Sequence, residues 1–225
     1  MRRLVKLFRR AQEILHTEGL PSLFRRGFDF VKPYFWIHQI CYLYEHPIRE
    51  ISESDFLPRT ENLIVRVVSS NREADLLSTE GLEFRERFVD ARRRLDSGAV
   101  ALCIFIGQDI AHITWLAMTK TAMNSCGGLP YEVDFLNKEA WTGGTFTIPK
   151  YRGLGLMGYS IFKKFQFLRE VGVVTVRHEV EVDNMASRKP YEKFEYKIYA
   201  KFRFLRILGW KFWKETPLAQ TDHID

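Results

Sequence analysis

The chain has 225 residues, of which 46% are hydrophobic, so it is long enough to bury a substantial core within one domain. Its net charge is +6, and no run of 18 apolar residues predicts a membrane-spanning helix. Three cysteines without C-x-x-C spacing and six scattered histidines predict neither a disulfide framework nor a metal site. No secretory leader follows Met1, so we expect a cytoplasmic protein.

Residues 2–32 predict basic amphipathic helices, because apolar side chains recur at helical spacing between arginines and lysines. Two interpretations remain open: an anchor on an anionic membrane surface, which would place the protein at the inner face of the membrane, or helices that pack on the rest of the chain. Nucleic acid is not an expected partner, because no recognised binding motif accompanies these basic residues. We therefore expect a basic helical and aromatic extension over residues 1–50 and a main domain over residues 51–225.

Apolar runs alternate with charged helical segments along the main domain. Strands are predicted at residues 63–68, 100–106, 110–118, 131–135, 141–148, 173–182 and 196–207. Helices are predicted at residues 72–97 with a break near Gly81, at 154–171 and at 184–194. This order predicts an α/β (α+β) fold with a mixed, mostly antiparallel sheet flanked by helices.

A glycine-rich turn between the strand at 141–148 and the helix at 154–171 has three interpretations. Gly153, Gly155 and Gly158 spell the dinucleotide-binding pattern G-x-G-x-x-G, but that pattern belongs early in a parallel sheet and here follows antiparallel runs. A nucleoside-triphosphate loop is disfavoured because Tyr159 replaces the lysine that reaches the phosphates. The third interpretation comes from a family resemblance.

The turn resembles the acyl-CoA pyrophosphate loop of the GNAT superfamily of N-acetyltransferases. The family pattern [QR]-x-x-G-x-[GA] reads Lys150-Tyr151-Arg152-Gly153-Leu154-Gly155 here, with Lys150 as a cationic departure. Residues 184–196 are similar to the family's N-x-x-[AS]-x-x-x-Y-x-K-x-G-F segment, although Glu195 replaces the glycine and Pro190 lies inside the expected helix. The resemblance covers about residues 62 to 200 and implies a GNAT-like sheet with acetyl-CoA as the cosubstrate.

The resemblance also implies which residues bind the cofactor. Glycines in the turn let the backbone approach the pyrophosphate, while backbone groups of the preceding strand bind the pantetheine arm and polarise the thioester carbonyl. Residues at the start of the helix at 184–194 contact the cofactor as well. The expected cofactor-binding residues are Phe146, Thr147, Ile148, Lys150, Arg152, Gly153, Leu154, Gly155, Gly158, Asn184 and Ser187.

Tyr191 matches the family's frequent general acid, which protonates the departing thiolate. Amine acetylation also needs a base, and strand alternation places Glu179 and Glu181 on one face of their strand. His178, His112, Glu132 and Glu139 are further candidates for the base, and a water chain could serve instead.

We therefore expect an acyl-CoA-dependent N-acyltransferase that transfers acetyl directly to a small-molecule amine, with an amino sugar or an envelope-glycan precursor as the candidate acceptor. The alternative is a non-catalytic acyl-CoA-binding or membrane-docking module on the same fold. A homodimer is left open by the sequence.

Overall fold

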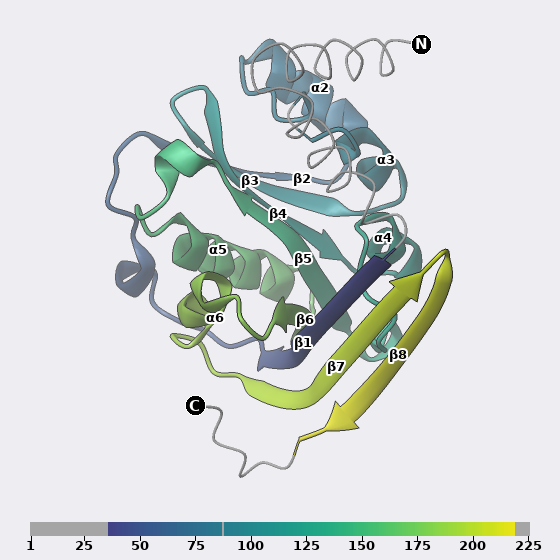
Figure 1. The fold of residues 1–225 in the computed structure, drawn as a ribbon. Coiled ribbons are helices and arrows are strands. Elements are labelled where there is room, and N and C mark those ends of the chain that lie inside the picture. The colour runs from purple at the N-terminus through teal and green to yellow at the C-terminus, as the bar shows by residue number, and fades with distance from the viewer. Residues whose placement is uncertain (1–35, 87, 219–225) are drawn as a thin grey trace, which may run out of the picture. The chain divides into compact units, whose positions relative to one another are not determined.

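The computed structural model describes residues 36–86 and 88–218. The described residues divide into two compact units, 41–86 and 88–202 with 215–218 in the larger and 36–40 with 203–214 in the smaller, and each is described by itself. The strands form one sheet in the order β2-β3-β4-β5-β6-β1-β7-β8 (Figure 1). Among the pairings described, only β5 and β6 run parallel, so the expected mixed and mostly antiparallel sheet is confirmed.

The elements follow one another in an order close to the predicted one. The strands are β1 (Trp36–Pro47), β2 (Leu63–Val68), β3 (Val100–Ile106), β4 (Asp109–Ala117), β5 (Glu139–Thr147), β6 (Thr175–Glu181), β7 (Lys197–Ile207) and β8 (Trp210–Pro217). The α-helices are α2 (Asn71–Thr79), α3 (Ala91–Asp96), α4 (Lys120–Ser125), α5 (Leu156–Glu170) and α6 (Met185–Tyr191). Short 3-10 turns are η1 (Glu53–Phe56), η2 (Phe135–Asn137) and η3 (Pro149–Tyr151).

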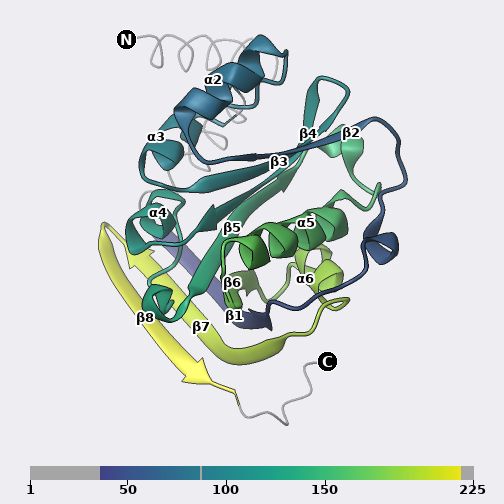
Figure 2. The same ribbon diagram turned by 180° about the vertical axis from the view of Figure 1, so that it is seen from behind.

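The larger unit has a core on both faces of its sheet. Helix α5 crosses one face, where Ile161, Phe165 and Leu168 pack against residues of β3 such as Leu102 (Figure 2). On the other face, the Arg94 guanidinium of α3 lies 5.0 Å from the centre of the Trp115 ring of β4. Strand β3 is therefore buried from both sides, which explains its uninterrupted apolar sequence.

Strands β5 and β6 separate soon after they begin to pair. Their register runs from Glu139↔Thr175 to Trp141↔Arg177, and within the described residues no pair follows. The part of β5 after Trp141 and the part of β6 after Arg177 are called the β5–β6 fork below. A shift of register between β4 and β5 lies beside the fork, where Gly144 has a φ of +57°.

Strand β1 contains residues that the sequence places in the N-terminal extension. It pairs antiparallel with β6, from Cys41↔Glu181 to Pro47↔Thr175, and the Leu43 side chain is fully buried. The domain boundary at residue 50 stays a prediction, but residues 41–47 are sheet residues of the larger unit. The predicted helices at residues 2–32 lie outside the described residues.

One predicted strand is wrong, and several elements, among them β1, β8 and α4, were not predicted from the sequence. Residues 131–134 have no regular structure and lead into η2, because Asp134 accepts a hydrogen bond from the Asn137 backbone and turns the chain there. Thr119 is the N-cap of helix α4, and its hydroxyl accepts a hydrogen bond from the Ala122 N–H.

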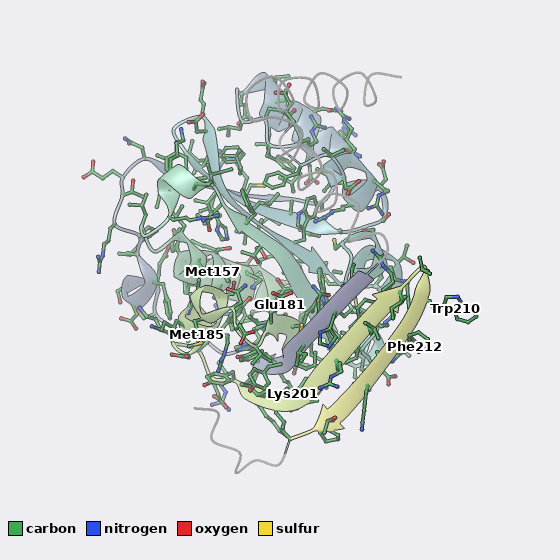
Figure 3. The ribbon with its side chains drawn as sticks, in the orientation of Figure 1. Met157, Glu181, Met185, Lys201, Trp210 and Phe212 are labelled. Atoms are coloured by element: carbon green, nitrogen blue, oxygen red, sulfur yellow. The ribbon has the colours of Figure 1, made fainter. Side chains whose placement is uncertain are left out.

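The described part of the smaller unit carries the turn between β7 and β8. Leu208 and Gly209 have φ values of +48° and +90°, and Trp210 and Phe212 of β8 project into solvent (Figure 3). In residues 36–86 and 88–218, no helix is long and apolar enough to cross a membrane.

We predict that Leu43→Ala lowers the free energy of unfolding by about 2–5 kcal/mol, because it opens a cavity where β1 meets the core. The matched control is Leu136→Ala, since Leu136 is 96% exposed and its replacement should change stability by less than about 0.5 kcal/mol. Urea unfolding measures both. Equal stability of the two variants would show that β1 is not part of the folded domain.

Candidate active site

A tight turn carries the chain from β5 into α5. Gly153 and Gly155 have φ values of +80° and +84°, which strongly favour glycine. Gly155 is the N-cap of α5 and offers no side-chain cap, so the first backbone N–H groups of the helix keep no intrahelical acceptor. These N–H groups and the positive end of the helix dipole suit an anion.

A cleft of about 930 Å³ lies against this turn. The turn, the end of β5, the first residues of α6 and the segment around η1 all contribute to its wall. Eight of the predicted cofactor-binding residues line it: Phe146, Thr147, Arg152, Gly153, Gly155, Gly158, Asn184 and Ser187. The two sequence segments that carry the family resemblance therefore meet in one site.

Three predicted cofactor-binding residues lie outside this lining: Ile148, Lys150 and Leu154. The Lys150 ammonium contacts the Asp109 carboxylate at 2.6 Å, and Tyr151 donates to the same carboxylate at 3.0 Å. The Ile148 N–H donates to the Ala111 carbonyl at 2.9 Å, so it is used within the sheet and is not available to polarise a thioester.

Several cationic residues that line the cleft were not among the predicted site residues. Arg59 precedes β2, and Lys189 and Lys193 lie in and just after α6. The Arg59 backbone N–H donates to the Leu154 carbonyl at 2.9 Å, which ties the η1 segment to the turn. With Arg152 they make four cationic residues in the lining against one acidic residue, Asp55, an excess of positive charge that suits phosphate groups. No local sequence signal marks Arg59, because its role depends on a contact with a distant segment.

The start of α6 forms the opposite wall of the cleft. The Asn184 side chain accepts a hydrogen bond from the Ser187 N–H at 3.1 Å and caps the helix. Met185 at the start of α6 and Met157 at the start of α5 lie on the same side of the unit (Figure 3). Asn184 thus has the capping role that the sequence predicts, and it lines the cleft as well.

Tyr191 follows the cleft residues Lys189 and Pro190, but its own side chain is buried behind them. Its hydroxyl accepts a hydrogen bond from the Lys164 amine at 3.0 Å, and its ring stacks on the ring of His178 at 3.9 Å. Burial raises the pKa of the Tyr191 phenol, and the nearby charge of Glu179 raises it further. The phenol is therefore protonated at neutral pH.

Glu179 lies in the β5–β6 fork on the face opposite to His178. Its carboxylate accepts hydrogen bonds from the Tyr131 hydroxyl at 2.6 Å and from the Trp141 indole N–H at 3.0 Å. Burial raises the pKa of Glu179, although these two donors oppose the shift. Glu181, two residues further along, is exposed at the end of β6. The structure therefore distinguishes two carboxylates that strand alternation alone treats as equal.

The remaining candidates for the base differ in burial and in their partners. His112 and His178 are buried, and burial lowers the pKa of both imidazoles, that of His112 to about 3. Glu139 pairs with Arg177 at 2.8 Å, and Glu132 is exposed. In the described residues, no group of three or more His, Cys, Asp or Glu is placed to hold a metal ion.

No protein-family model matches the chain, and no curated protein matches it. Among solved structures, it is similar to a GCN5-related glucosamine N-acetyltransferase region of a fungal multi-domain GH3 β-N-acetylglucosaminidase, with a TM-score of 0.52 and 12% identity over 83% of this chain and 23% of that one. A conserved protein of unknown function from Staphylococcus epidermidis matches with a TM-score of 0.47 and 14% identity over 80% of this chain and 66% of that one. A GCN5-related N-acetyltransferase from Sphaerobacter thermophilus matches with a TM-score of 0.44 and 12% identity over 88% of this chain and 57% of that one.

The chain thus spans at most 66% of the length of each of these three proteins. At such low identity the likeness concerns the fold. The chain has the fold of the GCN5-related N-acetyltransferases, and the expected GNAT-like architecture is confirmed at that level.

We predict that the double variant Gly153→Asp/Gly155→Asp binds acetyl-CoA at least about 100-fold more weakly, a loss of about 2.7 kcal/mol. Two carboxylate side chains would fill space beside the backbone N–H groups and repel the negatively charged pyrophosphate. Isothermal titration with acetyl-CoA measures the change, with NADH as a control ligand.

Gly172→Asp is the matched control variant, because Gly172 follows the opposite end of α5 and has nearly the same φ, +81°. It bears the same backbone strain at a distance from the cleft, so its affinity for acetyl-CoA should equal that of the wild type. Equal affinity of the double variant and the wild type would remove the turn from the binding site.

Proposed function

We propose that the chain is an acyl-CoA-dependent N-acyltransferase that transfers acetyl from acetyl-CoA directly to an amine. One observation carries this proposal: the glycine-rich turn and the Asn184–Ser187 segment, which are separated by α5 and β6, line one cleft with cations around it. A turn of this kind suits the pyrophosphate of the cosubstrate. The fold that the chain shares with a glucosamine N-acetyltransferase region supports the same reaction class.

The β5–β6 fork offers the groups that the transfer needs. Glu179 takes a proton from the acceptor amine, because burial raises its pKa and makes it a stronger base than a solvated carboxylate. The amine nitrogen then bonds to the thioester carbon, and the carbon–sulfur bond breaks. Tyr191 gives its phenolic proton to the departing thiolate.

The acceptor that we propose is a small amine, with an amino sugar as the first class to test. The glucosamine N-acetyltransferase region described above has the same fold, which makes glucosamine the leading probe. Release of the CoA thiol in the presence of glucosamine and of a panel of other amines tests the activity. Tight binding of acetyl-CoA without turnover of any amine would instead favour the non-catalytic acyl-CoA-binding module.

We predict that Tyr191→Phe lowers kcat by about 100-fold or more while KM for acetyl-CoA changes by less than about twofold, because proton donation to the thiolate is lost and Tyr191 does not line the cleft. Tyr159→Phe is the matched control, since the Tyr159 hydroxyl donates to Glu53 at 2.9 Å on another side of α5. Steady-state kinetics on both variants separates the roles. An unchanged kcat for Tyr191→Phe would assign the acid to another group.

We also propose that residues 2–32 attach the protein to an anionic membrane surface through basic amphipathic helices. The full chain should then sediment with anionic vesicles at low salt, and a chain lacking residues 2–32 should not. The deletion must end before Trp36, because β1 begins there and pairs with β6. Vesicles of neutral lipid provide the control, and equal sedimentation of both chains would reject the anchor.

A further inference from the structure

Helix α5 carries a lysine whose amine is buried next to the β5–β6 fork. The Lys164 residue is 1% exposed, and its amine donates to the Thr142 hydroxyl at 3.1 Å and to the Tyr191 hydroxyl at 3.0 Å. Burial lowers the pKa of this amine to about 7. An amine in such a place reduces stability compared with an apolar side chain of similar length. A role in function would explain why it is there.

The two hydrogen-bond partners of Lys164 come from different elements, Thr142 from β5 and Tyr191 from α6. Thr142 is the first residue of β5 after its last pair with β6, which is Trp141↔Arg177. Tyr191 ends α6, and its ring stacks on His178, the first residue of β6 after that pair. The amine thus joins β5 to α6 at the point where the two strands separate.

The direction of the hydrogen bond determines what the phenol can do. Because the Lys164 amine donates to the Tyr191 oxygen, the phenol keeps its own hydrogen for another acceptor. The ring of His178 lies face to face with the phenol ring, an orientation that does not offer its nitrogens in the plane of the hydroxyl. Lys164 therefore holds the phenol as a donor.

The titratable groups around Lys164 come from four elements. His46 and Tyr44 of β1, His112 of β4, His178 of β6 and Tyr191 of α6 surround its part of the core. Burial lowers the pKa of His46 and of His112 to about 3 and that of His178 further still, and the positive charge of Lys164 contributes to each shift. Burial raises the pKa of both phenols. Glu179, on the opposite face of β6, also acts on the Tyr191 phenol, and burial raises the pKa of its carboxyl. Among the groups on the Lys164 side of the sheet named above, Lys164 is the one whose pKa lies near 7.

We propose that Lys164 is a positioning residue of the acyl transfer: its amine directs the Tyr191 phenol and returns a proton to it after each turnover. This inference rests on the proposed function, with Tyr191 as the acid. When the carbon–sulfur bond breaks, sulfur keeps the electron pair and takes the proton from the Tyr191 oxygen. The phenolate then takes a proton from the Lys164 ammonium, and the neutral amine regains one from water. The acceptor amine releases the compensating proton, so the charges balance.

A purely structural lysine makes different predictions. Lys164→Met keeps the length of the side chain and removes the donor and the charge, so it should fold with equal or greater stability. Arg169→Met is the matched control on the same helix, since Arg169 is half-exposed and pairs with Glu50 at 3.6 Å. A structural role of Lys164 would leave both variants with wild-type kinetics.

The first measurement needs no acceptor. The carbon-13 signal of the phenolic carbon of Tyr191, assigned by its loss in Tyr191→Phe, is followed by NMR from pH 5 to pH 9. We expect a step with a midpoint near pH 7 in the wild type and in Arg169→Met, because the phenol senses the charge of Lys164, and no such step in Lys164→Met. A step that persists in Lys164→Met, or a flat trace in the wild type, overturns the inference.

The second measurement uses the amine that the panel identifies. We expect Lys164→Met to lower kcat about 10- to 100-fold with KM for acetyl-CoA changed by less than about twofold. Its pH–rate profile should lack the decline above about pH 7 that deprotonation of Lys164 causes in the wild type. If Lys164→Met has the kcat and the pH–rate profile of the wild type, the role of Lys164 is rejected and the proposed function still stands. Failure of the wild type to turn over any amine would reject the proposed function, and the inference with it.

Discussion

The separation of β5 from β6 is the constraint on which the candidate site depends. Paired strands satisfy their backbone groups mutually, so a parallel pair that ends at Trp141↔Arg177 leaves later backbone groups and side chains to find other partners. On one face, Glu179 accepts hydrogen bonds from the hydroxyl of Tyr131 and the indole N–H of Trp141. On the other face, Lys164 joins Thr142 to Tyr191. The candidate acid and base thus arise from one interruption of the sheet.

Charge is distributed unequally between the cleft and the interior. The cleft has cations and free helix N–H groups at its surface, where solvent limits the cost of their charge. The interior beneath it has ionisable groups whose pKa values shift toward the neutral form, namely the imidazoles, the phenol of Tyr191 and the amine of Lys164. A phosphate-bearing cosubstrate suits the first region, and proton transfer at neutral pH suits the second.

The sequence predicted those parts that depend on local pattern. The fully apolar run of β3 and the glycine-rich turn carry their signals within a few residues, and both were located correctly. The sequence did not assign β1, because His38 and Gln39 interrupt its aromatic-rich run and its partner β6 lies far along the chain. Lys163 and Lys164 are adjacent, and only the packing of α5 shows that one pairs with Glu53 near the surface and the other is buried. The distinction between Glu179 and Glu181 likewise depends on Tyr131, in a segment wrongly predicted as a strand.

The place of β1 has a consequence for the order of folding. Strand β1 is early in the sequence and pairs with the late strand β6, for example Cys41 with Glu181, so β1 joins the sheet only when β6 is available. During synthesis, β2, β3, β4 and β5 can pair with their neighbours as they emerge, because each adjoins the next in the sheet. Strand β1 must wait with its apolar side chains unpaired until β6 leaves the ribosome. The β5–β6 fork therefore forms only once β6 has been synthesised, and the candidate site is assembled after most of the sheet exists.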